Sequence, residues 1–290
     1  MNVVNFFKFI ESKRPHYSLE SLLPEWKVRG VIYPYNGKGT WNINGEKEGQ
    51  FEKYSYFFPE NEQANDAFDR ALKTGENLFL SEVINYKRGE LNGQCTTYYS
   101  NGQVKEIGNF QYGNRYGVHK AYYPDGKLDR EILYDNGIKN GYEKHYAKNG
   151  KLIGSSEWAL GRKHGQEKVW TDDGSVLIEV TNYVDGRREG PSIVFYSNGH
   201  PQRQATFKDD YIIGDFKKFH SNGVIEVHAY YENIDEEIPK FLIKYDWNGI
   251  KQEETIYTNT HKILRKYKDG EITHEENTPR MNRKSYGTFR

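Results

Sequence analysis

Aromatic and glycine positions recur along this chain with a period of about 24 residues, a spacing that indicates a repeat architecture. Asn-Gly or Asp-Gly pairs end at Gly102, Gly126, Gly150, Gly174, Gly199, Gly223 and Gly249. Four residues before each of these glycines stands an aromatic residue: Tyr98, Tyr122, Tyr146, Trp170, Phe195, Phe219 and Tyr245. Eight or nine residues after each stands a second aromatic: Phe110, Tyr134, Trp158, Tyr183, Phe207, Tyr231 and Tyr257. The pattern predicts seven copies of one structural unit.

Each Asn-Gly or Asp-Gly pair is predicted to reverse a strand in a two-residue type I′ turn, because that turn needs positive φ at both central positions. A second turn is expected about eleven residues later. It falls at Gly89, Gly113, Gly137, Gly161 and Gly186, with Asp210 and Asp235 in the last two copies. We expect this second turn to be the looser one. Each unit is then a strand, a tight turn, a strand and a looser turn.

Hairpins of this length are barely stable alone and gain stability by stacking on their neighbours. The predicted fold class is mainly β, an elongated, curved antiparallel β-hairpin repeat array with a small N-terminal α+β cap. With 15% aromatic and only 36% hydrophobic residues, the interior must be thin. We expect both aromatic columns to pack on the inner face of the sheet.

Three segments are predicted. Residues 1–75 form the cap, with helices over 2–13 and 61–73 and a strand-like stretch over 26–58; the first helix covers the end of the sheet or, alternatively, contacts a membrane surface or a partner. Residues 76–270 form the repeats. Residues 271–290 form a polar tail, expected to be frayed.

The spacing Gly-x4-Tyr-x-x-Asn-Gly-Lys, followed by an aromatic, is carried by residues 117–134, 141–158 and 190–207. This pattern resembles the bacterial MORN-like repeat of YwqK-type antitoxins, over about two thirds of the chain. The resemblance implies a protein that neutralises a toxin by binding it. MORN repeats elsewhere serve as scaffolds or are proposed to touch lipids.

Composition narrows the class of partner. The 41 basic residues equal the 41 acidic ones, whereas nucleic-acid-binding proteins normally carry a basic excess, so no nucleic acid is expected. Cys95 is the only cysteine, which favours a reducing cytoplasm. Lys8 interrupts the N-terminal apolar run and no basic region precedes it, so no signal peptide is expected. No run approaches the 18 apolar residues of a membrane span, and a membrane partner is not expected.

The sequence offers no recognisable reaction centre. Its nine histidines form no HxxxH pair, and none is spaced from Cys95 as metal ligands are. Phosphate-binding loops and nucleophile elbows are absent. We therefore expect no enzyme activity, no cofactor and no metal.

Two surfaces are candidates for binding a partner protein. Strand alternation directs the residue after each first-column aromatic away from that column, so Tyr99, Tyr123 and Tyr196 are predicted to face a partner; the alternative is plain β-propensity at half-exposed positions. The second surface is the acidic break formed by Glu232, Asp235, Glu236 and Glu237, which could steer a basic toxin. Its alternative is a solvated insertion.

Three functions are compatible with these features. The first is a non-enzymatic, cytoplasmic antitoxin or immunity protein whose protein partner is a toxin encoded nearby. The second is a structural or membrane-associated scaffold. An enzyme acting on polysaccharide ranks last, because no acid and base can be nominated. An exposed terminal strand after Lys240 leaves both monomer and dimer open.

Overall fold

The computed structural model describes residues 31–32, 40–56, 78–233 and 238–280, which contain strands and no helix. The chain divides into two compact units, Met1–Gly141 and Tyr142–Arg290. The predicted helices over 2–13 and 61–73 lie outside the described residues. The mainly β fold class is confirmed, as is the antiparallel hairpin repeat.

The first unit contains β1 (Val31–Ile32), β2 (Thr40–Trp41), β3 (Lys47–Tyr56), β4 (Leu78–Lys87), β5 (Glu90–Leu91), β6 (Gly93–Tyr98), β7 (Val104–Gln111), β8 (Asn114–Tyr122) and β9 (Leu128–Asp135). Strand β10 (Ile138–Tyr146) continues from the first unit into the second. The second unit contains β11 (Leu152–Ala159), β12 (Arg162–Lys163), β13 (Gly165–Trp170), β14 (Leu177–Val184), β15 (Arg187–Phe195), β16 (Pro201–Lys208), β17 (Tyr211–Phe219), β18 (Ile225–Tyr231), β19 (Phe241–Tyr245), β20 (Lys251–Tyr257), β21 (His261–Lys268) and β22 (Glu271–Pro279).

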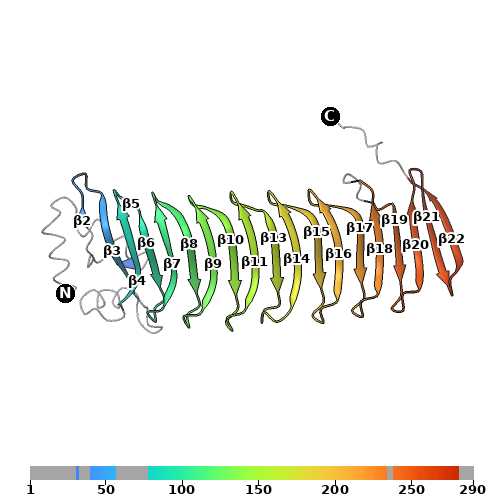
Figure 1. The fold of residues 1–290 in the computed structure, drawn as a ribbon, viewed down its shortest axis with the longest axis horizontal. Helices are drawn as coiled ribbons and strands as arrows, with labels where there is room; N and C mark the ends of the chain where they lie inside the picture. The colour runs from blue at the N-terminus through green and yellow to red at the C-terminus, as the bar shows by residue number, and fades with distance from the viewer. Residues whose placement is uncertain (1–30, 33–39, 57–77, 234–237, 281–290) are drawn as a thin grey trace, which may run out of the picture. The chain divides into compact units, whose positions relative to one another are not determined.

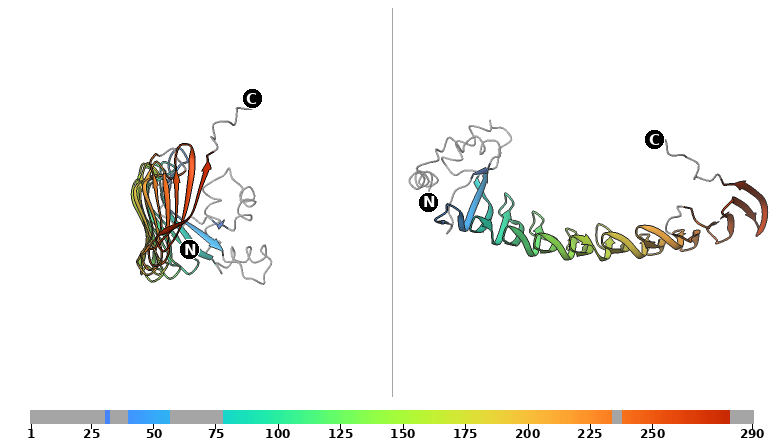
Figure 2. Two further views of the ribbon diagram at one scale, coloured as in Figure 1. Left: turned by 90° about the vertical axis from the view of Figure 1, so that its right-hand side faces the viewer. Right: turned by 90° about the horizontal axis from the view of Figure 1, so that it is seen from above.

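Strands that follow one another in the chain are neighbours in the sheet and pair antiparallel. In the first unit β6 pairs with β7 and β7 with β8, and in the second β15 pairs with β16 and β16 with β17. Figure 1 shows this chain order within each unit, and the views in Figure 2 show the strands of each unit in one layer. The sheet of each unit therefore has no second sheet or helix packed on it among the described residues.

The second set of turns was predicted to be loose, but from Gly89 to Asp210 these turns are two-residue reversals. The predicted turn at Asp235 lies outside the described residues. Gln111 pairs with Asn114, so only Tyr112 and Gly113 lie between the strands. Their φ angles are 51° and 80°, the two positive values that a type I′ turn requires. Leu160-Gly161 and Asp185-Gly186 have the same geometry. These turns, rather than the Asn-Gly pairs, are the tight ones.

The prediction of type I′ turns at the Asn-Gly and Asp-Gly pairs was wrong. Tyr99 N donates to Gln103 O at 2.8 Å and Gly102 N donates to Tyr99 O at 2.9 Å, which closes a three-residue loop. Gly102 has φ 83°, whereas Asn101 does not have positive φ. A turn followed by one left-handed glycine is a common three-residue hairpin loop. Asn101 contributes through its side chain, whose Oδ1 accepts from Gln103 N at 3.0 Å.

Hydrogen bonds connect successive turns along both edges of the sheet. At the three-residue loops, the turn asparagine donates from Nδ2 to a backbone carbonyl of the next repeat: Asn101 to Pro124 (2.8 Å), Asn149 to Asp173 (2.8 Å), Asn198 to Ser221 (2.7 Å) and Asn222 to Trp247 (2.9 Å). At the two-residue turns, the second residue's N–H donates to a carbonyl of the preceding repeat: Gly113 to Leu91, Gly137 to Arg115, Gly186 to Lys163 and Asp210 to Arg188. The spacing between repeats is thus fixed by hydrogen bonds to backbone carbonyls at each edge, from asparagine side chains at one and from backbone N–H groups at the other.

Glycine also sets the position of the second aromatic column. Five rings of this column, and Tyr86 before it, stand directly opposite a positive-φ glycine of the preceding strand: Tyr86 opposite Gly49, Phe110 opposite Gly93, Tyr134 opposite Gly117, Tyr183 opposite Gly165, Phe207 opposite Gly190 and Tyr231 opposite Gly214. A glycine has no Cβ, so the neighbouring ring covers backbone that would otherwise be exposed. The Gly49–Tyr86 pair shows that this arrangement begins within residues 1–75.

The two aromatic columns do not share one face, contrary to the expectation. Thr97 pairs with Glu106, and Phe110 lies four residues beyond Glu106 on the same strand, so these side chains share a face. Tyr98 follows Thr97 and therefore points to the other face. In the second unit, Val194 pairs with Arg203, which shares a face with Phe207 four residues later. Phe195 follows Val194 and therefore points to the other face. Aromatic rings on both faces are what a one-layer sheet can accommodate.

One row of cross-strand neighbours on the face of Phe207 forms the best-buried part of the second unit. This central row consists of Glu167, Thr181, Ser192, Ala205, Phe216, Ala229, Leu242, Thr255 and Leu264. Thr181 and Ala229 are each 1% exposed. Most other strand residues are only half-buried. Burial in this unit is therefore greatest along the middle of the strands.

The C-terminal segment differs from its predicted form. A polar tail was expected from residue 271, but Glu271–Pro279 forms β22, which pairs with β21 through eight registered positions. Every residue of β22 is exposed. Charged side chains on an exposed end strand disfavour further strand addition.

His119 is packed among aromatic rings in the first unit. Its ring centroid lies 5.3 Å from that of Phe110 and 5.1 Å from that of Tyr134, with edge-on geometry. Its Nε2 lies 2.8 Å from the Asn109 carbonyl oxygen. Its cross-strand neighbourhood includes Gly108, where an added Cβ would overlap the imidazole. Burial lowers the pKa of His119 below its ordinary value, and the positive charge of Arg115 adds to this, although the Asn109 carbonyl and Glu106 act in the opposite direction.

The hydrogen bond from Asn198 Nδ2 to the Ser221 carbonyl of the next repeat gives a prediction about stability. Asn198→Asp keeps the Oδ acceptor for His200 N but removes the Nδ2 donor to Ser221 O, so unfolding free energy should fall by about 0.5–1 kcal/mol in urea denaturation. Asn248→Asp is the matched control, because the Asn248 side chain has no hydrogen bond within the described residues. Equal losses of unfolding free energy in both variants would contradict a stabilising role for the hydrogen bond between the repeats.

The His119 environment gives a prediction about pH. A histidine whose folded-state pKa lies below its unfolded value of about 6.5 favours folding when neutral, so its contribution is complete above that pH and is lost as pH falls. The His119 imidazole should titrate below pH 6.5 by NMR. The thermal midpoint should fall more between pH 7.5 and 5.5 in the natural chain than in His119→Gln. Titration at or above 6.5 would refute the packing account.

Candidate functional site

Two of the predicted partner-facing tyrosines form hydrogen bonds that join adjacent repeats. The Tyr99 hydroxyl donates to the Tyr122 carbonyl at 2.7 Å, and the Tyr196 hydroxyl donates to the Phe219 carbonyl at 2.7 Å. Both side chains are half-buried. At the same repeat position Ala147 is only 7% exposed, and His220 Nε2 lies 3.2 Å from the Tyr245 carbonyl oxygen. This position therefore contributes to stacking between repeats.

The remaining predicted residues are dispersed. Tyr123 is half-buried, and its pKa is raised by burial and by the neighbouring Asp129 carboxylate. Glu232 is ion-paired with Lys240, whose Nζ lies 2.7 and 2.9 Å from its carboxylate oxygens. Asp235, Glu236 and Glu237 lie outside the described residues. Tyr99 and Tyr123 belong to adjacent repeats of the first unit, where the Tyr99 hydroxyl binds the Tyr122 carbonyl, whereas Tyr196 and Glu232 belong to the second unit.

The type I′ turns contain exposed apolar residues that sequence reasoning missed. Tyr112 is 70% exposed and Leu160 is 77% exposed, and each occupies the first turn position with φ of 51° and 49°. Asn136 and Asp185 hold the equivalent position in other repeats. Asn and Asp tolerate left-handed φ, whereas apolar side chains rarely adopt it. The signal was present in the sequence as Tyr-Gly and Leu-Gly at turn positions.

The central row of the second unit begins with polar residues. The Thr181 hydroxyl lies 2.7 Å from the Ser192 hydroxyl and donates to Glu179 Oε1 at 2.9 Å. Glu167 Oε1 accepts from Lys163 Nζ at 2.5 Å and from the Ser156 hydroxyl at 3.2 Å. Burial raises the pKa of Tyr183 to about 12, and the Glu167 carboxylate adds to this. The Glu167 charge is therefore held by several donors.

A groove of about 350 Å³ lies beside this polar network. It is lined in part by Glu143, His145, Trp158, Lys163 and Glu167. Glu143 is 8% exposed, and its Oε1 lies 3.1 Å from His145 Nε2. A buried carboxylate is costly without partners, and here hydrogen bonds and a basic neighbour compensate it. The arrangement is a hydrogen-bonded polar network on the sheet surface.

A second groove of about 360 Å³ lies on the same face, over β15–β18. Its walls are Phe207, Phe216 and Tyr231, and its rim includes Arg188 and Arg203. Arg188 Cζ lies 4.1 Å from the Phe207 ring centroid, and Arg188 Nε donates to Asp210 Oδ1 at 3.1 Å. We call this the arginine–aromatic groove. It combines apolar walls with cationic groups.

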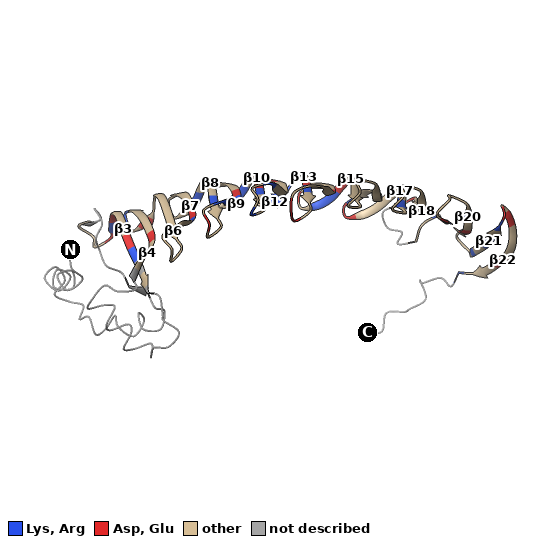
Figure 3. Ribbon diagram, turned by 90° about the horizontal axis from the view of Figure 1, so that it is seen from below, with Lys and Arg blue, Asp and Glu red and all other residues tan. Residues whose placement is uncertain are grey.

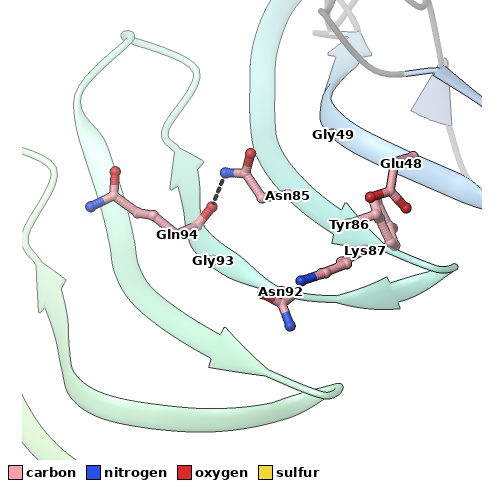
Figure 4. Close-up of a pocket in the computed structure, with 8 residues that line it drawn as sticks. All are labelled: Glu48, Gly49, Asn85, Tyr86, Lys87, Asn92, Gly93 and Gln94. Atoms are coloured by element: carbon pink, nitrogen blue, oxygen red, sulfur yellow. Dashed lines mark hydrogen bonds between the residues drawn. The ribbon is translucent and has the colours of Figure 1, made fainter.

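The first unit has a larger hollow of about 560 Å³ beside the bulge glycines Gly49 and Gly93. Figure 4 shows that it is lined by Asn85, Asn92, Tyr86, Lys87 and neighbouring residues, and that Asn85 Nδ2 donates to the Gln94 carbonyl, at 2.5 Å. Asn182 makes the same bond to the Pro191 carbonyl in the second unit. This asparagine therefore satisfies a carbonyl at the bulge, which is a structural role.

Charges are mixed along the strands of each unit, and Figure 3 shows basic and acidic positions interspersed rather than separated into blocks. Within the described residues no three His, Cys, Asp or Glu side chains are grouped as a metal site would need. None of the described segments is a helix long and apolar enough to cross a membrane. Cys95 is a free thiol whose pKa is raised by burial.

The family model described as the MORN repeat variant matches residues 91–112, 115–136, 188–209 and 213–233. Three of these segments end at the first residue of a type I′ turn, and each contains one hairpin with its three-residue loop. These segments of the chain are therefore MORN-like repeats. The match identifies the repeat and does not distinguish antitoxins from other proteins that contain it.

No curated protein matches the chain. Among solved structures, a porin-like protein from Bacteroides uniformis ATCC 8492 is 11% identical, with a TM-score of 0.19, over 83% of this chain and 87% of that one. TcdB2-TccC3 without its hypervariable C-terminal region is 10% identical, with a TM-score of 0.15, over 85% of this chain and 18% of that one. TM-scores this low support no conclusion about fold or function.

The hydrogen bond from Tyr196 to the Phe219 carbonyl gives a prediction about stability. Tyr196→Phe removes the donor to a half-buried carbonyl, so the unfolding free energy should fall by about 1 kcal/mol in urea denaturation. Tyr211→Phe is the control, because Tyr211 is 56% exposed and its hydroxyl has no hydrogen bond within the described residues. A loss in the control as large as that in Tyr196→Phe would overturn the assignment.

Proposed function

We propose that this protein is a non-enzymatic, protein-binding repeat protein that acts in the cytoplasm as an antitoxin, neutralising a toxin encoded nearby by direct contact. The observation that carries the binding part of this proposal is the exposure of Tyr112 and Leu160 in left-handed turn conformations.

Left-handed φ at a residue with a Cβ costs on the order of 1 kcal/mol. Exposing a large apolar side chain there gives no compensating burial within the described residues. Asn136 occupies the same turn position in the next repeat, and its side chain is used for stability: its Oδ1 accepts a hydrogen bond from Asn114 Nδ2 at 3.0 Å. Backbone strain at an exposed apolar residue is typical of functional positions, and Tyr is favoured in protein interfaces.

The one-layer sheet also favours a binding role. Both faces of each unit retain half-exposed side chains, and the charged groups of the polar network are already paired with one another. The antitoxin part of the proposal is supported by the resemblance of the repeat pattern at residues 117–134 and 190–207 to YwqK-type antitoxins. Cytoplasmic location is supported by the single cysteine.

Tyr112 should show a trade-off between stability and binding. Tyr112→Asn copies the residue of the next repeat, so the unfolding free energy should rise by about 0.5–1 kcal/mol, while affinity for the partner falls. Tyr112→Ala is the control: it keeps a Cβ in the strained turn and loses the ring, so affinity should fall without the gain in stability. Undiminished partner binding by both variants would remove Tyr112 from the interface.

The function itself is tested with the products of the adjacent genes. Each is co-expressed with the full chain and assayed by co-purification, isothermal titration calorimetry and rescue of growth. We expect one of them to be toxic alone, to bind with a defined stoichiometry and to lose toxicity when bound. Absence of both binding and rescue for every neighbour would contradict the antitoxin proposal.

A further inference from the structure

The arginine–aromatic groove contains a cation with no counter-ion. Arg188 is paired with Asp210, and the neighbouring Lys218 is paired with Glu226, whose Oε1 lies 2.7 Å from Lys218 Nζ. Arg203, on β16, stands next to Lys218 in the cross-strand register, and it has no ion pair or hydrogen bond within the described residues. The groove therefore carries one uncompensated positive charge.

The floor and walls of the groove are apolar. Ala205 follows two residues after Arg203 on β16 and pairs with Phe216 on β17, so a small side chain stands next to a large one. Ala205 is 7% exposed and Phe207 is 8% exposed. Tyr231, opposite Gly214 on the next strand, and the exposed Tyr211 complete the lining. A volume of about 360 Å³ accommodates one or two side chains.

We propose that the arginine–aromatic groove is a docking site for an acidic segment of the partner protein, with a carboxylate on Arg203 and an adjacent apolar side chain against Phe216 and Tyr231, which are half-buried. A guanidinium can bind a carboxylate through two parallel hydrogen bonds, and aromatic walls supply area for an apolar neighbour. This proposal rests on the proposed protein-binding function and specifies the chemistry of the bound segment.

The preference for an acidic segment follows from charge complementarity. A basic segment would leave Arg203 facing a like charge, and a neutral one would leave it without a counter-ion as surrounding water is excluded. The exposed location on a one-layer sheet favours a peptide segment over an enclosed small molecule. Binding should weaken as salt is raised, because the ion pair forms at the surface.

The experiment uses a phage-displayed library of random 12-residue peptides, panned on the immobilised full chain. Enriched peptides should contain Asp or Glu next to Phe, Leu or Ile. The best peptide, synthesised with a fluorescent label, should bind Arg203→Glu at least about tenfold more weakly than the natural chain, and Arg203→Lys should show an intermediate loss. Lys208→Glu makes the same charge change on the opposite face of β16 and should leave affinity unchanged.

Three outcomes of the peptide experiment would contradict the groove assignment. No enriched peptide, a consensus without acidic residues, or equal binding by Arg203→Glu and the natural chain would each overturn the groove assignment. If a toxin binds Arg203→Glu as well as the natural chain, the groove proposal fails while the antitoxin function stands. If peptides bind through Arg203 but no adjacent gene product is bound, the function fails and the groove assignment stands.

Discussion

Most of the structure depends on the two-residue turn with left-handed φ at both positions. This turn sets the register of the two strands that it joins, and the N–H of its second residue donates to a carbonyl of the preceding repeat. The backbone twist of a type I′ turn matches that of the flanking strands, so the same reversal can be repeated without strain accumulating between repeats. The three-residue loops and their asparagine bonds hold the other edge. Side-chain packing acts within a frame that hydrogen bonds already define.

A one-layer sheet built in this way has little interior. In the second unit the best-buried residues belong to the central row, and most other strand residues are half-exposed. Stability must therefore come from many short-range contacts between adjacent strands, as in other repeat proteins. The same geometry leaves a large surface whose side chains can vary without loss of the fold. Tyr112, which is exposed, and Arg203, which has no ion pair among the described residues, are examples of such surface positions.

The period, the strands and the turn locations could be predicted from the sequence because glycines and aromatics are placed by backbone requirements. The type of each turn could not. Asn-Gly is common in type I′ turns, but Asn101 also accepts from Gln103 N through Oδ1, and this bond suits the three-residue loop equally well. The prediction that the two aromatic columns share one face was wrong. Thr97 pairs with Glu106 and so lies on the face of Phe110, which directs the next residue, Tyr98, to the opposite face.

The candidate site was harder to predict. Tyr99 and Tyr196 have the composition of interface residues, yet their hydroxyls bind carbonyls of the next repeat, a contact that depends on the distance between stacked turns. Strain at Tyr112 follows only once the correct turn type is known. The grooves join residues from up to four strands, which no single repeat reveals.

The most direct measurement is the backbone φ of Tyr112 and Asn101 in the intact chain, obtained from NMR scalar and residual dipolar couplings. Left-handed φ at Tyr112 together with negative φ at Asn101 is the result required by the account. Negative φ at Tyr112 with positive φ at Asn101 would exchange the two turn types and contradict it.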